Sequence, residues 1–235
     1  MGLEASFAEE SNFAPWMFDV IFHDIRNYNN VALNYLYFLK EINITDDTEI
    51  INTVIQQITK SSDLLSTIEK ISHNGSPPRE KRIDLGVVIQ HCISQIREMF
   101  PTTPIEIISL IEAGKHFIES DTLIVDLFIN LLSNAIKYTP QLLKKVHLYV
   151  EEWSGSNYIA VLVADEGRGI PDTQKHKIFD RYNSRIPGEK VEGRGLGLSI
   201  VRACAERLGG SVFVKDRPDS VQGSVFEVIL PLSKS

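Results

Sequence analysis

The sequence predicts an α+β chain in which an N-terminal antiparallel helical hairpin precedes a two-layer α/β sandwich. Three observations support this prediction. Apolar residues recur at helical spacing over residues 12–42 and 48–72, a stretch rich in Gly, Pro and charge follows at 73–82, and strand-like segments then mix with helical ones. We therefore expect a hairpin domain over residues 12–76 and the sandwich over residues 77–235.

The hairpin domain is expected to contain two long helices, over residues 12–42 and 48–72, joined by the turn sequence NITDD at 43–47. Pro15 suits the first turn of the first helix, where no backbone N–H is needed. One hairpin cannot bury the apolar stripes of both helices by itself. Two chains are therefore expected to pair into a four-helix bundle, which predicts a homodimer.

The sandwich is expected to contain helices at 86–99, 121–138 and 196–210, the last of them ended by Gly209 and Gly210. The Gly-rich, charged stretch at 166–195 is too long for a simple connection, and loops of this length in a compact domain are usually functional lids or disordered. The predicted strands lie at 105–111, 115–118, 145–153, 157–165, 211–216 and 224–232.

The overall composition is that of an ordinary soluble globular protein. The chain of 235 residues is 43% hydrophobic and 23% charged, with a net charge of −7, which argues against a general nucleic-acid or membrane-surface binder. Cys92 and Cys204 have no metal-ligand spacing, so we expect buried free thiols in a reducing compartment. No apolar run is long enough to span a bilayer, so the expected location is the cytoplasm. Any membrane attachment would come from a sensor part that this sequence does not contain.

Polar residues interrupt the apolar helix at 121–138. Asn130 and Asn134 are four apart and share one face, with Lys137 and Tyr138 one turn further on. An amide oxygen suits Mg²⁺, a lysine can meet a phosphate, and a tyrosine can stack on a base. For an isolated pair of this spacing, however, asparagines that face solvent or cap a neighbouring segment are the commoner explanation.

Two glycine-rich motifs follow. Asp165 ends an apolar strand, and Gly167 and Gly169 come directly after it. A carboxylate at a strand end can accept a hydrogen bond from an amine such as that of adenine, although the motif alone is equally consistent with a turn. The second motif, GRGLGL at 193–198, leads into a helix whose free N–H groups could bind phosphate, but it is neither a Walker loop nor GxGxxG.

The order and spacing of these motifs from residue 121 to the end, with Gly223, Ser224 and Phe226 in the last strand, resemble the histidine-kinase branch of the Bergerat-fold ATPases. The resemblance implies that Asn134 holds Mg²⁺, that Asn130 and Lys137 lie near the phosphates of ATP, and that Asp165 binds the adenine amine. The remaining residues implied at the nucleotide are Tyr138, Gly167, Gly169, Gly193, Arg194, Gly195, Leu196, Gly197, Leu198 and Ser224. Arg194 departs from the Thr or Ser that is commoner in the family.

The sequence HDIRN at 23–27 resembles the phospho-acceptor box of the same kinases. The resemblance makes His23 the nucleophile, Asp24 its hydrogen-bond partner, and Asn27 a residue for the reverse, phosphatase reaction. Successive helix residues do not share a face, so the contact between His23 and Asp24 requires a bend of the side chains. Tyr28 stands where the commonest version of the box has proline.

The implied function is that of a two-component protein histidine kinase: ATP-dependent autophosphorylation of His23, then transfer to an aspartate of a response regulator. An ATP-binding regulatory or scaffold protein without kinase activity is the alternative, and the presence of His23, Asp24 and Asn134 speaks against it. An ATP-driven clamp would need further domains. The sequence leaves open the input signal, the cognate regulator, the kinase–phosphatase balance, and whether phosphorylation occurs within or between subunits.

Overall fold

The structure is a computed structural model that describes residues 15–42, 50–55, 57–59, 61–62, 65, 81–152, 157–179, 196–219 and 221–233. The chain divides into two compact units, Met1–Ser76 and Pro77–Ser235. None of the helices in the described ranges is both long enough and apolar enough to cross a membrane.

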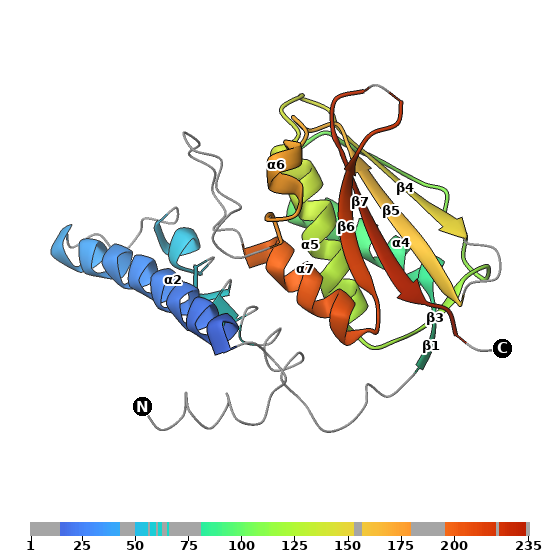
Figure 1. Cartoon of the computed structure of the whole chain (residues 1–235). Coiled ribbons are helices and arrows are strands. Elements are labelled where there is room, and N and C mark those ends of the chain that lie inside the picture. The colour runs from blue at the N-terminus through green and yellow to red at the C-terminus, as the bar shows by residue number, and fades with distance from the viewer. Residues whose placement is uncertain are drawn as a thin grey trace. The chain divides into compact units, whose positions relative to one another are not determined.

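The described residues of the first unit are all helical. Its long helix α2 (Pro15–Ile42) lies within the helix predicted at 12–42, and residues 12–14 lie outside the described residues (Figure 1). His23, Asp24 and Asn27 all lie within α2, and the helix continues through Tyr28. The described residues between 50 and 65 are helical too, whereas the predicted turn at 43–47 lies outside the described residues.

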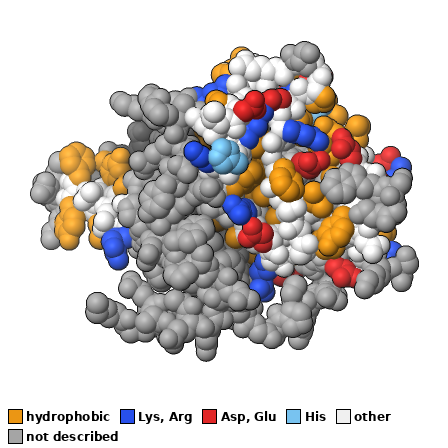
Figure 2. All heavy atoms as spheres, viewed as in Figure 1, with side chains coloured by type: hydrophobic (Ala, Val, Ile, Leu, Met, Phe, Trp, Pro, Cys, Tyr) orange, Lys and Arg blue, Asp and Glu red, His pale blue; other side chains and the backbone are white. Residues whose placement is uncertain are grey.

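The C-terminal half of α2 carries large hydrophobic side chains that are exposed in the single chain. Figure 2 shows hydrophobic side chains over much of the described part of this unit. Five large hydrophobic residues of α2 are each 39% to 62% exposed: Leu33, Tyr35, Leu36, Tyr37 and Phe38. Large apolar patches that stay open to water often mark an interaction surface.

The second unit is built on a five-stranded mixed sheet with the order β2-β4-β5-β7-β6. Strands β2 and β4 are parallel, and the other neighbouring pairs are antiparallel. A separate two-stranded sheet pairs β1 with β3. The strands are β1 (Lys81–Asp84), β2 (Ile105–Ser109), β3 (Phe117–Ser120), β4 (Lys144–Glu152), β5 (Tyr158–Asp165), β6 (Ser211–Asp216) and β7 (Ser224–Pro231).

Three helices cover one face of this sheet (Figure 1): α4 (Leu85–Met99), α5 (Leu123–Tyr138) and α7 (Leu196–Arg207). The central helix α5 packs against α4, α7, β4 and β5, and Leu127, Phe128 and Leu131 on it are completely buried. The short α6 (Asp172–Lys175) lies beside β6. The predicted two-layer α/β sandwich is therefore confirmed.

The predicted C-terminal cap of α7 is also confirmed. The N–H of Gly209 donates to the carbonyl of Glu206 at 3.1 Å, and that of Gly210 donates to Ala205 at 2.8 Å, which together make a Schellman motif. A Cβ atom on Gly210 would lie 2.0 Å from the carbonyl oxygen of Ile229 on β7. This glycine therefore lets the end of the helix lie directly on the sheet.

Two details of the prediction are wrong. Lys81 and Arg82 were assigned to the linker at 73–82, but they lie in β1, because this short charged segment pairs with β3; residues 73–80 lie outside the described residues. The strand predicted at 115–118 instead runs over Phe117–Ser120. Cys92 and Cys204 are buried and free, as expected.

Candidate functional site

The two asparagines of α5 face the first turn of α7. A Cβ atom on Gly197 would lie 3.2 Å from Oδ1 of Asn130 and 3.4 Å from Nδ2 of Asn134. The Nδ2 group of Asn130 donates to the carbonyl of Asp126 at 2.8 Å, so the helix holds this amide with Oδ1 toward α7. The prediction that Asn130 and Asn134 share one face is confirmed, and Gly197 is the residue that lets α7 approach them.

The beginning of α7 supplies backbone N–H groups that the helix itself does not use. The first residues of any α-helix lack an acceptor for their N–H groups, and the helix dipole makes this end attractive to anions. Leu196 begins α7, and Gly197 and Leu198 follow in its first turn. Gly193, Arg194 and Gly195 lie outside the described residues.

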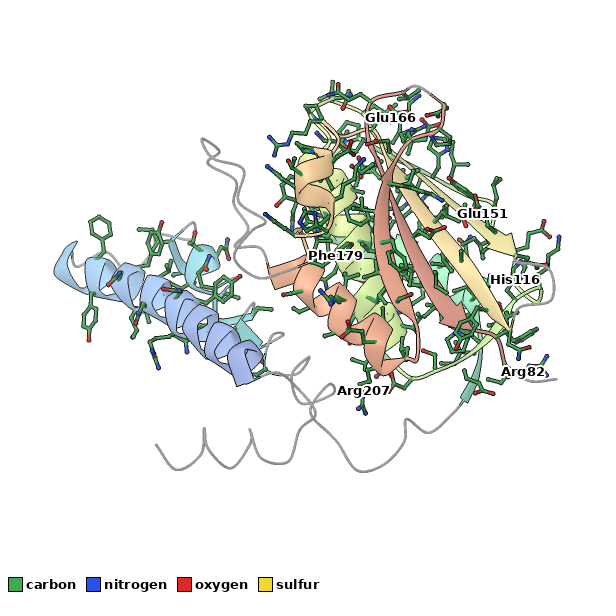
Figure 3. The ribbon with its side chains drawn as sticks, in the orientation of Figure 1. Arg82, His116, Glu151, Glu166, Phe179 and Arg207 are labelled. Atoms are coloured by element: carbon green, nitrogen blue, oxygen red, sulfur yellow. The ribbon has the colours of Figure 1, made fainter. Side chains whose placement is uncertain are left out.

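Asp165 lies at the end of β5 with its side chain held by two backbone N–H groups. Its Oδ1 accepts from Gly167 at 2.8 Å and from Ser224, the first residue of β7, at 3.2 Å. Within the described residues, Oδ1 accepts both of the hydrogen bonds made to this carboxylate. Oδ2 therefore remains as an acceptor for a ligand. Glu166, labelled in Figure 3, marks this end of the sheet.

The environment of Asp165 disfavours the ionised form of its carboxyl group. The residue is only 6% exposed, and this burial raises the pKa of its carboxyl above the ordinary 3.8. The N–H groups of Gly167 and Ser224 and the positive charge of Arg217 lower the pKa, but they offset only part of the effect of burial. A buried carboxylate with a spare oxygen is suited to accept a hydrogen bond from a neutral amine.

The loop after β5 lies against the C-terminal end of α5. A Cβ atom on Gly167 would come within 2.8 Å of Oδ1 of Asp165 and 3.2 Å of the carbonyl oxygen of Tyr138. Gly169 has a positive φ of 77°, which other residues rarely adopt. The guanidinium of Arg168 lies 5.9 Å from the centre of the Tyr138 ring, within the range of a cation–π contact.

Helix α5 thus joins two chemically different regions. Its C-terminal end contacts the loop of Asp165 through Tyr138, and Asn130 and Asn134 meet the positive end of α7. An elongated ligand with an amine-bearing ring at one end and phosphate groups at the other would match this arrangement.

The donor set fits a Mg²⁺ ion that is bound together with phosphates. Within the described ranges there is no group of three or more His, Cys, Asp or Glu residues that could hold a metal. Mg²⁺ often takes only one or two protein oxygens and fills its remaining positions with water and substrate phosphates. The half-buried amide of Asn134 can supply such an oxygen, and the exposed Lys137 follows one turn later on α5.

Sequence reasoning missed one residue at this site, Arg217. It follows β6, and its guanidinium donates to the main-chain oxygen of Asp165 at 3.1 Å. No pattern in the sequence links residue 217 to residue 165. Ser224 was predicted at the site, and the structure shows that its backbone N–H contacts Asp165.

Replacing Gly197 by alanine should weaken binding of the nucleotide that the sequence predicts, without loss of stability. The added methyl group would push on the amides of Asn130 and Asn134, whereas alanine in place of glycine favours the helix by up to about 1 kcal/mol. We expect a loss of roughly fivefold in the affinity for Mg·ADP, about the value of one hydrogen bond. Titration with a fluorescent ADP analogue would measure the affinity, and thermal unfolding the stability; an unchanged affinity would contradict the prediction.

Comparison with known proteins agrees with this geometry. Residues 119–234 match the family model described as histidine kinase-, DNA gyrase B-, and HSP90-like ATPase. This match supports the Bergerat-type fold for the second unit.

Two similar curated proteins are a sensory kinase and a sensor protein. The chain is 31% identical over 151 residues, 64% of its length, to the adaptive-response sensory kinase SasA of Rippkaea orientalis (strain PCC 8801 / RF-1), of which it covers 38%. It is 26% identical over 216 residues, 90% of its length, to the swarming motility regulation sensor protein RssA of Serratia marcescens, of which it covers 45%. The chain thus spans less than half the length of these relatives.

A solved structure extends the likeness in fold beyond the ATPase domain. The histidine kinase ThkA, in complex with the response regulator protein TrrA, matches with a TM-score of 0.67 at 23% identity, over 92% of this chain and 61% of that one. These comparisons support a histidine-kinase catalytic core in this chain.

Proposed function

We propose that this chain is an ATP-dependent protein histidine kinase that phosphorylates its own His23 and passes the phosphoryl group to an aspartate of a response regulator. The observation that carries the proposal is the position of α5: its C-terminal end lies against the loop that follows the buried Asp165, and its Asn130–Asn134 face meets the first turn of α7. This arrangement offers one acceptor for an adenine amine and one region for a triphosphate.

The second unit would bind and orient ATP. Oδ2 of Asp165 would accept from the adenine amine, and the ring of Tyr138 would stack on the base. Asn130, Lys137 and the first turn of α7 would contact the phosphates, because amide, ammonium and free N–H groups all neutralise phosphate charge. When bound, Mg²⁺ would be held by Asn134 and would neutralise charge on the phosphates.

The first unit would supply the acceptor. A neutral imidazole has one nitrogen with a lone pair near pH 7. That nitrogen of His23 would attack the γ-phosphorus of ATP, so that an N–P bond forms while the bond from phosphorus to the bridging oxygen breaks and ADP leaves. Asp24 would hold the other nitrogen. Asn27 lies one turn after His23 on α2, where it would orient a water molecule for dephosphorylation of the regulator.

The partners follow from the same proposal. The exposed apolar side chains of α2 support a homodimer, in which the helices of two chains would form a four-helix bundle. The ThkA structure, solved with its response regulator, supports a receiver domain as the second partner. The free, buried thiols of Cys92 and Cys204 fit a reducing, cytoplasmic location.

Incubation of the protein with γ-labelled ATP and Mg²⁺ tests the proposal directly. We expect label on the chain that acid removes and alkali does not, because a phosphoramidate bond is acid-labile. Addition of a cognate receiver domain should move the label to that domain. Nucleotide binding without any label on the chain would instead favour an ATP-binding protein without kinase activity.

A further inference from the structure

Arg217 is a buried cation that holds the residue proposed to read the adenine base. Its side chain is only 8% exposed. One terminal nitrogen donates to the main-chain oxygen of Asp165 at 3.1 Å, Nε donates to Oδ1 of Asp219 at 3.0 Å, and the other terminal nitrogen donates to Oδ2 of Asp219. The fork of the guanidinium thus joins the turn after β6 to the end of β5.

A glycine makes this contact possible. A Cβ atom on Gly223 would lie 2.0 Å from the main-chain oxygen of Asp165 and 2.9 Å from Cδ of Arg217. Any side chain at position 223 would therefore force these two residues apart. The next residue, Ser224, donates its N–H to the carboxylate of the same Asp165. Arg217 fixes the backbone of Asp165 while Ser224 fixes its side chain.

Stability alone is a weak reason to bury an arginine in this place. Removing a guanidinium from water is costly, and replacing a buried ion pair by apolar residues is often neutral or stabilising. Asp219, in contrast, keeps 48% of its side chain exposed. A pair that served only to close the turn between β6 and β7 would not need its cation placed against the carbonyl of Asp165.

We propose that Arg217 is a positioning residue for base recognition: it holds the end of β5 so that Oδ2 of Asp165 stays aligned with the amine of an adenine nucleotide. This inference rests on the proposed function, in which Asp165 contacts the base. The groups that act on the charge of Asp165 agree with this role. Arg217 and the N–H groups of Gly167 and Ser224 favour the ionised carboxylate, and Arg217 also interacts with the neighbouring Glu166.

Two nucleotides that differ at one position of the base can distinguish a positioning role of Arg217 from a general role in stability. ADP carries an amine at position 6 of the base, whereas inosine diphosphate carries a carbonyl oxygen there. If Arg217 acts through Asp165, its loss should affect ADP alone. If Arg217 only holds the fold together, its loss should weaken both nucleotides equally.

The experiment measures the affinity of the whole chain for ADP and for inosine diphosphate by calorimetry, with Mg²⁺ present. The unmodified protein should prefer ADP. Arg217→Met, which keeps much of the side chain's length without its charge, should bind ADP about tenfold more weakly and inosine diphosphate as before. Arg217→Lys should bind ADP with an affinity between those of the unmodified protein and Arg217→Met. Arg202→Met is the matched control, because Arg202 pairs with Glu206 on the exposed face of α7, and it should leave both affinities unchanged.

Each remaining outcome has a definite meaning. Equal losses for both nucleotides, or a full preference for ADP in Arg217→Met, would overturn the positioning role. If Arg217→Met does not fold, Asp219→Asn provides the test, since it leaves Arg217 in place without its orienting carboxylate and should also lower the preference for ADP. The proposed function fails separately, if the unmodified protein shows no preference for ADP or if Asp165→Asn does not abolish that preference.

Discussion

Replacing His23 by glutamine should abolish phosphorylation of the chain and leave nucleotide binding intact. His23 lies in α2 of the first unit, whereas the residues proposed to bind ATP lie in the second unit, so the substitution removes the nucleophile alone. Glutamine is also a better helix former than histidine, so α2 should not be weakened. Acid-labile label from γ-labelled ATP should fall to background, a loss of more than about 100-fold. The affinity for ADP should not change.

The matched control for this experiment is His91→Gln. His91 also lies on a helix, α4, and its side chain is exposed. This variant should keep full labelling. Retention of acid-labile label in His23→Gln would show that another residue accepts the phosphoryl group, and the proposed role of His23 would then be wrong.

Replacing Asp165 by asparagine should remove most of the affinity for ADP. An asparagine at this position can still accept from Gly167 and Ser224 through Oδ1, so the local fold should persist. Its NH₂ group would then stand where Oδ2 stood, and a donor would face the donating amine of adenine. A hydrogen bond to a charged group contributes about 1.5–3 kcal/mol, so we expect a loss of roughly 10- to 100-fold.

The same substitution should not destabilise the nucleotide-free protein. The raised pKa of Asp165 means that folding disfavours its ionised form. Its contribution to the free energy of unfolding is therefore fully present below the ordinary pKa of 3.8 and is lost as the pH rises through the raised value. At neutral pH the asparagine variant avoids this loss, and thermal unfolding without nucleotide should show an equal or higher midpoint.

The pH dependence of ADP binding has the opposite sign to that of the free energy of unfolding. Because the ionised carboxylate is the better acceptor, the affinity of the unmodified protein for ADP should fall as the pH is lowered through the raised pKa of Asp165. Calorimetry over a pH series would measure this change, and the asparagine variant should show little of it. Asp216→Asn is a suitable control, since Asp216 is an exposed partner of Lys175 at the end of β6. An Asp165→Asn variant with normal affinity would contradict the prediction.

The elements that the sequence predicted well are those whose signals are local. The strand at 211–216 was predicted with its observed bounds, because a short run of β-branched and aromatic residues, Val212 to Val214, follows a double glycine. The end of α7 was predicted from Gly209 and Gly210, since the Schellman motif depends on conformations that glycine favours. The shared face of Asn130 and Asn134 followed from helical spacing alone.

The elements that it missed depend on contacts between distant segments. The four residues of β1 carry three charges and look like part of a linker, and they form a strand only because β3 offers them a partner. In the sequence, Arg217 comes directly after a predicted strand, where exposed turn residues are common. Its burial arises from Asp165, 52 positions away, which no pattern within either segment reveals.

The order of strands in the sheet determines when the second unit can fold during synthesis. Strand β7 is the latest of the five in sequence, yet it lies between β5 and β6, and among the described strands it is the only partner of β6. As the chain leaves the ribosome, β6 therefore has no strand to pair with until residues 224–231 have emerged. Because Asp165 also lacks the N–H of Ser224 until then, ATP should stabilise only the completed unit and not its growing precursor.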